Sequence, residues 1–138
     1  MNRNLIIAIC LIFCLVATIL YRTYNKPHKD LSDIPADFKI SASDWLKEFE
    51  QNEESAQTKY LNKIVRVQGV LTEIQQVDQK IIWIIETGNP LANVQCEMDP
   101  RFIDLTKNIS TGTTIDVQGI CSGKLMDIVM NQAVVVGR

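Results

Sequence analysis

The sequence predicts an all-β domain with flanking helices, and three observations support this fold class. From residue 64 onward, apolar side chains mostly alternate with polar ones, which is the period of a β-strand. Five such segments follow one another, with a single helical segment between the third and the fourth. Two of them carry a glycine inside a β-branched stretch, Gly69 and Gly119, where the chain needs to bend. The order β-β-β-α-β-β is that of the OB-fold, a five-stranded Greek-key barrel whose strands coil sharply.

The first element is an apolar segment near the N-terminus. Residues 5–20 contain one polar side chain and no charge. Arg3 precedes them, and Tyr21 and Arg22 follow, which suits the two interfaces of a bilayer. The length is close to the roughly 17–25 residues that span a membrane. We therefore predict a transmembrane or signal-anchor helix within residues 1–24, with the lipid bilayer as the partner of residues 5–20. A cleaved secretory signal and a buried core helix are the alternatives.

The next segment is polar and has no periodic pattern. Residues 25–40 include two prolines and the only histidine of the chain, His28. We predict a polar tether over these residues, with the histidine in solvent. Residues 41–138 then form the predicted OB-fold domain together with an N-terminal helix.

An amphipathic helix is predicted to open this domain. Ser41 and Asp44 have the spacing of a capping box, with a hydroxyl at the start and a carboxylate three residues on. Trp45, Phe49 and Tyr60 recur on one face, and acidic residues fill the other. The apolar face either packs against the barrel, which is the usual role of such a face, or binds a partner.

The five strands of the barrel follow in order. We expect them at residues 64–74, 81–85, 94–98, 113–121 and 128–136, the last interrupted by a bulge or bend at residues 131–132. Polar turns are expected at residues 75–79 and 122–124. Asp99 and Pro100 open the helix between the third and fourth strands, with an acid at the cap and a proline in the first turn. This helix is expected to end near Asn108.

These residues resemble a bacterial family of envelope-associated OB-fold domains, named for their likeness to the tRNA-anticodon-binding OB domain. The resemblance covers about residues 42–136. Its motifs are Trp45, Leu46, Phe49, Ala56, residues 59–61, Val65, Val67, Gly69, and residues 94–96, 117–123 and 127–129. The resemblance implies the fold and a place in the cell envelope, and it implies no established reaction.

The location of the domain follows from this resemblance and from the apolar segment. Arg3 stands on one side of that segment, and Arg22, Lys26 and Lys29 stand on the other, so the charges do not decide the orientation. A short basic leader before an apolar segment is typical of exported chains. We predict a single-pass protein of the bacterial inner membrane, with the OB domain in the periplasm.

Candidate ligand-binding residues lie on the outward face of the first three strands. They are Arg66, Gln68, Lys80, Ile82, Ile84 and Gln95. The polar flanks of the second strand place Ile82 and Ile84 outward and Trp83 inward. Either the helix with Trp45 and Phe49 covers the two isoleucines, or they bind an envelope protein, a peptide or a glycan. The predicted function is a membrane-anchored binding module of the cell envelope.

Single-stranded nucleic acid is the alternative ligand, because many OB-folds bind it. From residue 40 onward, nine Lys and Arg stand against thirteen Asp and Glu, a net charge of −4. An acidic domain repels a polyphosphate. The second and third strands also present one cation, Lys80, and no outward aromatic ring for stacking. The sequence therefore argues against nucleic acid.

No enzyme activity, cofactor or metal is predicted. No serine or cysteine has a histidine placed to activate it, and neither a CxxC motif nor a histidine at metal-ligand spacing is present. Cys96 and Cys121 are expected to face inward on the third and fourth strands. They form either a disulfide across the core or two buried, reduced thiols.

Overall fold

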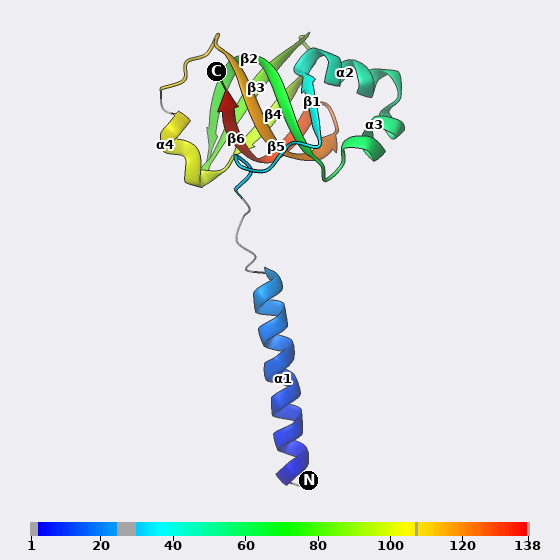
Figure 1. Ribbon diagram of the computed structural model, residues 1–138, viewed down its shortest axis with the longest axis vertical. Coiled ribbons are helices and arrows are strands. Elements are labelled where there is room, and N and C mark those ends of the chain that lie inside the picture. The colour runs from blue at the N-terminus through cyan, green and yellow to red at the C-terminus, as the bar shows by residue number, and fades with distance from the viewer. Residues whose placement is uncertain (1–2, 25–29, 107, 138) are drawn as a thin grey trace.

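The computed structural model describes residues 3–24, 30–106 and 108–137 (Figure 1). The elements run in the order α1 (Arg3–Tyr24), β1 (Phe38–Ser41), α2 (Ala42–Gln51), α3 (Glu53–Tyr60), β2 (Ile64–Val77), β3 (Lys80–Asn89), β4 (Ala92–Met98), η1 (Pro100–Phe102), α4 (Ile103–Thr106), β5 (Thr114–Lys124) and β6 (Ile128–Gly137).

Strands β2 to β6 close into a barrel. Strand β2 pairs antiparallel with β3 along its second half and with β5 along its first half, and β4 pairs parallel with β6. The remaining ladders, β3–β4 and β5–β6, are antiparallel. Among the described residues the sheet thus has six strands, because β1 adds to β2 in parallel outside the five-stranded barrel. The predicted OB-type barrel and its β-β-β-α-β-β order are confirmed.

The structure of β1 and of the residues before it differs from the predicted polar tether. Residues 25–29, including His28, lie outside the described residues. Downstream, Leu31 is 1% exposed, and Phe38 pairs with Val65 at the start of β1. The prediction of a tether up to residue 40 is therefore wrong in its second half. Four residues are too few for alternation to distinguish a strand from an extended linker.

The two glycines allow close approach of neighbouring groups. A Cβ on Gly69 would overlap the Cγ2 of Ile85 and press on the Cβ of Ala42, where α2 begins. A Cβ on Gly119 would lie 3.0 Å from the carbonyl oxygen of Asn131 on β6. The β5–β6 register also shifts between Gln118 and Ile120, so the predicted bend at Gly119 is confirmed. The register shift of β2 falls later, between Leu71 and Glu73.

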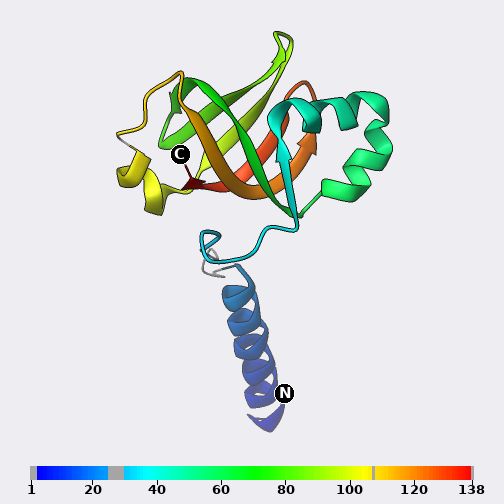
Figure 2. The ribbon, with the colours of Figure 1, turned by 45° about the horizontal axis from the view of Figure 1, so that its top comes forward.

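Helices α2 and α3 cover one side of the barrel, and α4 lies on the opposite side (Figure 2). The amide of Asp44 donates to the hydroxyl of Ser41, so the predicted cap is confirmed. Trp45, Phe49 and Tyr60 are buried in the barrel's core cluster. The apolar face of this helix therefore packs, and the partner-binding alternative is wrong. One helix was expected where the structure has two, because Asn52 interrupts it and caps α3.

Both predicted polar turns differ from the structure: the first is shorter than expected, and the second lies at residues 125–127 instead of 122–124. Strand β2 continues through residues 75–77, and β5 continues to Lys124. Polar side chains on both faces do not end a strand whose backbone is paired, and β3 pairs with β2 up to Val77. The predicted bulge in the last strand is confirmed: Gln132 has a φ of 53°, and the β4–β6 register shifts beside it.

Helix α1 has 22 residues and stands apart from the barrel (Figure 1). Its large apolar side chains that the structure describes, from Ile7 to Leu20, are exposed. Within the described residues, no helix is both long enough and apolar enough to cross a membrane. The membrane anchor predicted over residues 5–20 is not confirmed.

Candidate functional site

Four of the predicted ligand-binding residues share the outer face of β3 and β4. Ile84 lies opposite Gln95 and Ile82 opposite Glu97, and Lys80 begins β3. Trp83 points inward into the core, as predicted. Ile82 is half-buried and Ile84 is 8% exposed.

Helix α2 does not cover these isoleucines. Its Trp45 and Phe49 belong to the core cluster, with Trp83 and Ile85 from the inward face of β3. The alternative in which the helix covers Ile82 and Ile84 is therefore wrong.

The polar groups of this face are largely paired. Lys80 Nζ lies 2.9 Å from the carboxylate of Glu97. The carboxylate of Asp127 accepts hydrogen bonds from the amide of Asn93, at 2.7 Å, and from the side chain of Gln95. These bonds hold the β5–β6 turn, residues 125–127, against the outer side of β4.

The β5–β6 turn carries two highly exposed apolar side chains. Leu125 is 90% exposed and Met126 is 77% exposed. The surface formed by Lys80, Ile82, Ile84, Gln95 and this turn is called the β3–β4 face below. It corresponds to the strands and the loop with which OB-folds bind oligonucleotides and oligosaccharides.

Arg66 and Gln68 lie on a different surface. They sit on the first half of β2, between β1 and β5, where Arg66 lies opposite Gln118 and Gln68 opposite Asp116. The guanidinium of Arg66 donates to Asp116 Oδ2, with Nη2 at 2.5 Å and Nε at 3.2 Å. The six predicted residues thus divide between two surfaces, because the 14-residue β2 turns from one half of the barrel to the other.

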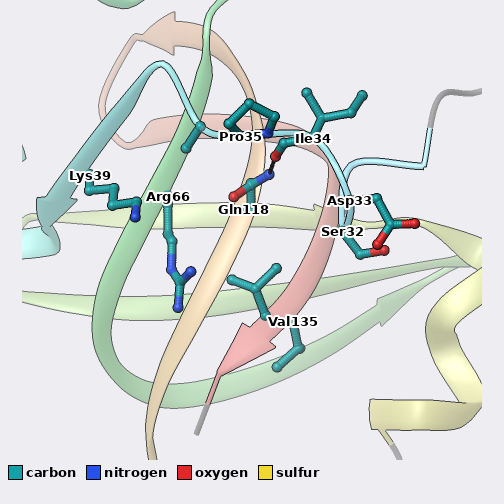
Figure 3. A pocket seen from close by; sticks show the side chains of 10 residues that line it. Ser32, Asp33, Ile34, Pro35, Lys39, Arg66, Gln118 and Val135 are labelled. Carbon is teal, nitrogen blue, oxygen red and sulfur yellow. Dashed lines mark hydrogen bonds between the residues drawn. The ribbon is translucent and has the colours of Figure 1, made fainter.

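A cavity of about 620 Å³ opens beside Arg66 (Figure 3). Its lining residues are Ser32, Asp33, Ile34, Pro35, Ala36, Lys39, Arg66, Gln118, Val135 and Val136. A second hollow of about 400 Å³ adjoins it, since Lys39 and Arg66 line both. The sequence prediction missed Lys39 and Gln118. Lys39 lies between Phe38 and Ile40, and this short alternation was the only signal for it.

Residues 30–36 are called the strap below, and residues 32–36 of it form one wall of this cavity. The side-chain amide of Gln118 donates to the carbonyl oxygens of Leu31 and Ile34, both at 2.6 Å. Gln118 is 4% exposed, so these bonds replace the water that its amide would otherwise need.

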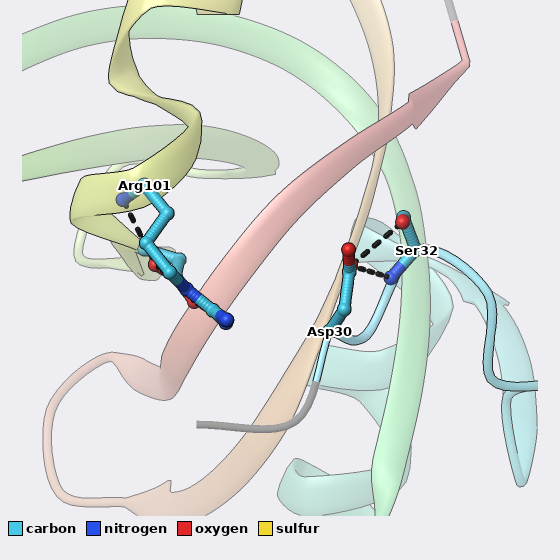
Figure 4. A network of polar contacts seen from close by, with 4 residues as sticks. Asp30, Ser32 and Arg101 are labelled. Carbon is cyan, nitrogen blue, oxygen red and sulfur yellow. Dashed lines mark hydrogen bonds and ion pairs between the residues drawn. The ribbon is translucent and has the colours of Figure 1, made fainter. Parts of the chain in front are cut away.

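A local turn begins the strap. The Asp30 carboxylate accepts from the amide and the hydroxyl of Ser32, at 3.0 and 2.7 Å (Figure 4). These two bonds, with a smaller contribution from the charge of Arg101, lower the pKa of Asp30. Such a carboxylate-to-backbone turn stiffens the start of the strap.

Cys96 and Cys121 are separated by a strand. In the described part of the chain all cysteines are free thiols. Met130 on β6 lies opposite Cys96 on one side and Cys121 on the other. Two strand spacings place the two cysteines about 9–10 Å apart, beyond the Cα separation of roughly 4–7 Å that a disulfide needs. The structure therefore contains two buried, reduced thiols and no disulfide between them. Burial raises the pKa of Cys96 to about 12.

The acidic residue at the start of η1 has a structural role. Asp99 is buried and accepts from the amide of Arg101 at 3.0 Å, and Arg101 Nη2 lies 2.6 Å from its carboxylate. The side chain thus caps the turn, as expected for an acid at this position. Over the described residues, no group of three or more His, Cys, Asp or Glu side chains is placed to hold a metal ion.

The closed five-stranded barrel and its two outer surfaces define a binding domain of the OB type. The sequence model of the tRNA_anti-like family matches residues 1–134, and the chain belongs to this family. A search of curated proteins finds no match.

Solved structures are similar to this chain. A "putative nucleic acid-binding lipoprotein" from Klebsiella pneumoniae is 18% identical with a TM-score of 0.60, over 74% of this chain and 98% of that one. A "putative aspartyl-tRNA synthetase" from Leishmania major is 13% identical with a TM-score of 0.48, over 88% of this chain. An asparaginyl-tRNA synthetase from Pyrococcus horikoshii is 18% identical with a TM-score of 0.43, over 57% of this chain. The chain spans only 26% and 21% of these two synthetases.

Proposed function

We propose that the chain is a non-catalytic binding module and that its β3–β4 face binds single-stranded nucleic acid. The observation that carries the proposal is membership in the tRNA_anti-like family, whose model matches residues 1–134. The name of the Klebsiella protein, which shares the barrel over nearly its whole length, supports the same ligand. The proposal reverses the balance drawn from the net charge and from the lack of an outward aromatic ring, which argued against nucleic acid.

The contacts on this face define how the nucleic acid is held. Ile82, Leu125 and Met126 offer apolar surface to bases, and Lys80, which is paired with Glu97, is the cation of this face that can turn to a phosphate. Among the described residues of the face no aromatic ring is present, so stacking contributes little. Binding is then weak and contacts few phosphates. With one such cation, the logarithm of the binding constant falls with the logarithm of the salt concentration with a slope of about −0.7.

A titration of labelled single-stranded RNA and DNA, followed by fluorescence anisotropy at several salt concentrations, tests this proposal. Ile82→Glu places a carboxylate in the middle of the face, and we expect a loss of affinity of about tenfold or more. Lys47→Glu on α2, an exposed residue away from the face, is the matched control and leaves the affinity within about twofold. Absence of binding at low salt, or equal binding by Ile82→Glu, contradicts the proposal.

An envelope binding module is the second candidate function. It is favoured by α1, whose described apolar side chains are exposed. We propose that α1 holds the chain at the bacterial inner membrane with the barrel in the periplasm, where the same face binds an envelope protein, a peptide or a glycan. In a flotation assay with phospholipid vesicles, the full chain should float. The double variant Leu11→Arg, Leu15→Arg should remain in the lower fraction, and equal flotation of both contradicts attachment through α1.

A further inference from the structure

We infer that the cavity between the strap and β2, β5 and β6 is a second binding site, for a small organic anion with a phosphate or carboxylate head and an apolar body. It is separate from the β3–β4 face. None of the similar proteins assigns a ligand to this cavity. Among its lining residues, only Arg66 was predicted from the sequence to bind a ligand.

The charges at one end of the cavity select an anion. Lys39 lies directly opposite Arg66 on the neighbouring strand. Like charges at directly opposed positions destabilise a sheet. Asp116 neutralises Arg66 through an ion pair of 2.5 Å, whereas among the described residues none forms an ion pair with Lys39. Both side chains extend toward the same hollow (Figure 3). With Arg66 paired to Asp116, the charge of Lys39 stays uncompensated at this end of the cavity, and an anionic head beside Lys39 pairs with it.

The rest of the cavity suits an apolar body. Ile34 and Pro35 of the strap face Val135 and Val136 of β6 across it. Ser32 and Asp33 lie at the end away from Lys39 and Arg66, where they can accept hydrogen bonds from a hydroxyl or amino group (Figure 3). The volume of about 620 Å³ lies within the roughly 300–1,000 Å³ of small-molecule sites. From one end of the cavity to the other the lining is cationic, then apolar, then polar. A ligand with an anionic head, an apolar middle and a polar tail matches this order.

The wall of the cavity is fixed before any ligand binds. Both amide hydrogen bonds of the buried Gln118 hold strap carbonyl groups, and Leu31 is buried beside them. A pre-organised site avoids the entropic cost of ordering a loop on binding. The strap is therefore a structural part of the site.

Two probes carry an anionic head on a body: adenosine monophosphate and octanoate. Each is titrated into the isotope-labelled full chain while the amide signals of Lys39, Arg66 and the strap are followed by NMR. We expect saturable shifts with at least one probe. Lys39→Met should weaken binding of that probe about tenfold, which corresponds to ~1.4 kcal/mol. Lys63→Met removes an exposed lysine outside the cavity and leaves the binding unchanged.

Three outcomes overturn the inference. The first is that neither probe shifts these signals. The second is that Lys39→Met binds the probe as tightly as the parent chain does. The third is that inorganic phosphate alone binds as tightly as the better probe, because the apolar body then contributes nothing to binding. The test is independent of the proposed function. Ile82→Glu should weaken oligonucleotide binding and leave the cavity probes unaffected, so the two proposals fail separately.

Discussion

At Gly69, β2 lies close against β3 and the start of α2. An added methyl group would overlap Ile85 and press on Ala42, and both neighbours are fixed in the core. We predict that Gly69→Ala lowers the free energy of unfolding by about 1–3 kcal/mol, the usual effect of overpacking. Urea denaturation followed by tryptophan fluorescence measures it. Gln68→Ala, an exposed neighbour on the same strand, is the control and should change stability by less than about 0.5 kcal/mol.

Cys96 links the stability of the barrel to alkaline pH. Complete burial raises the pKa of its thiol from 9.0 to about 12, so the folded protein keeps the proton at a pH where the unfolded chain loses it. The folded state thus binds more protons above pH 9, and its stability falls as the pH rises from 9 toward 12. We predict that Cys96→Ala shows a smaller loss of stability between pH 7 and pH 10 than the parent chain. Equal losses in urea titrations at the two values would exclude this role of the thiol.

At the scale of elements, the strap depends on one side chain. Gln118→Leu keeps the volume but removes both donors to the carbonyl groups of Leu31 and Ile34. We predict faster amide hydrogen exchange across residues 30–36, while the strands of the barrel keep their protection. Gln68→Leu, the same change on the exposed face of β2, should leave the strap as it is. If exchange in the strap is unchanged in Gln118→Leu, the burial of Leu31 alone holds it.

The elements also differ in how far the sequence could predict them. Strands β2, β4 and β5 alternate over enough residues for their inward faces to be recognised, and the Ser41 cap follows a local rule. Strand β1 and the strap follow no local rule. They are ordered by partners far along the chain, Val65 for Phe38 and Gln118 for Leu31, and a local pattern does not contain such contacts.

At the scale of the whole molecule, the barrel presents two surfaces that one strand connects. Alternation predicted correctly that Arg66 and Ile82 both face outward. It could not predict their positions around the barrel, because these depend on where β2 leaves β5 and joins β3. The candidate site was therefore correct in the direction of its side chains and wrong as a single patch. The cavity by Lys39 needed the fold itself, since its lining comes from the strap, β1, β2, β5 and β6.

The location of the barrel decides which of its proposed ligands it can meet. The structure makes a simple reporter possible: Cys96 and Cys121 are buried, and only Cys10 and Cys14 among the described cysteines are exposed. Replacing these two by serine leaves no reactive thiol in the folded barrel, and Thr111→Cys then adds one in an exposed loop. Asp37 does not suit a reporter, because its carboxylate accepts a hydrogen bond from the amide of Ile64 at 2.8 Å.

Intact cells are treated with a maleimide that passes the outer envelope but not the inner membrane. If the barrel is exported, the chain with Thr111→Cys is labelled and the chain without this change is not. We predict this result. Such labelling directs the search for ligands of the β3–β4 face to envelope peptides, glycans and extracellular nucleic acid. Labelling only after lysis contradicts the periplasmic location. It would place the barrel among cellular RNA, where a face with few cations has to compete with proteins that contact many more phosphates.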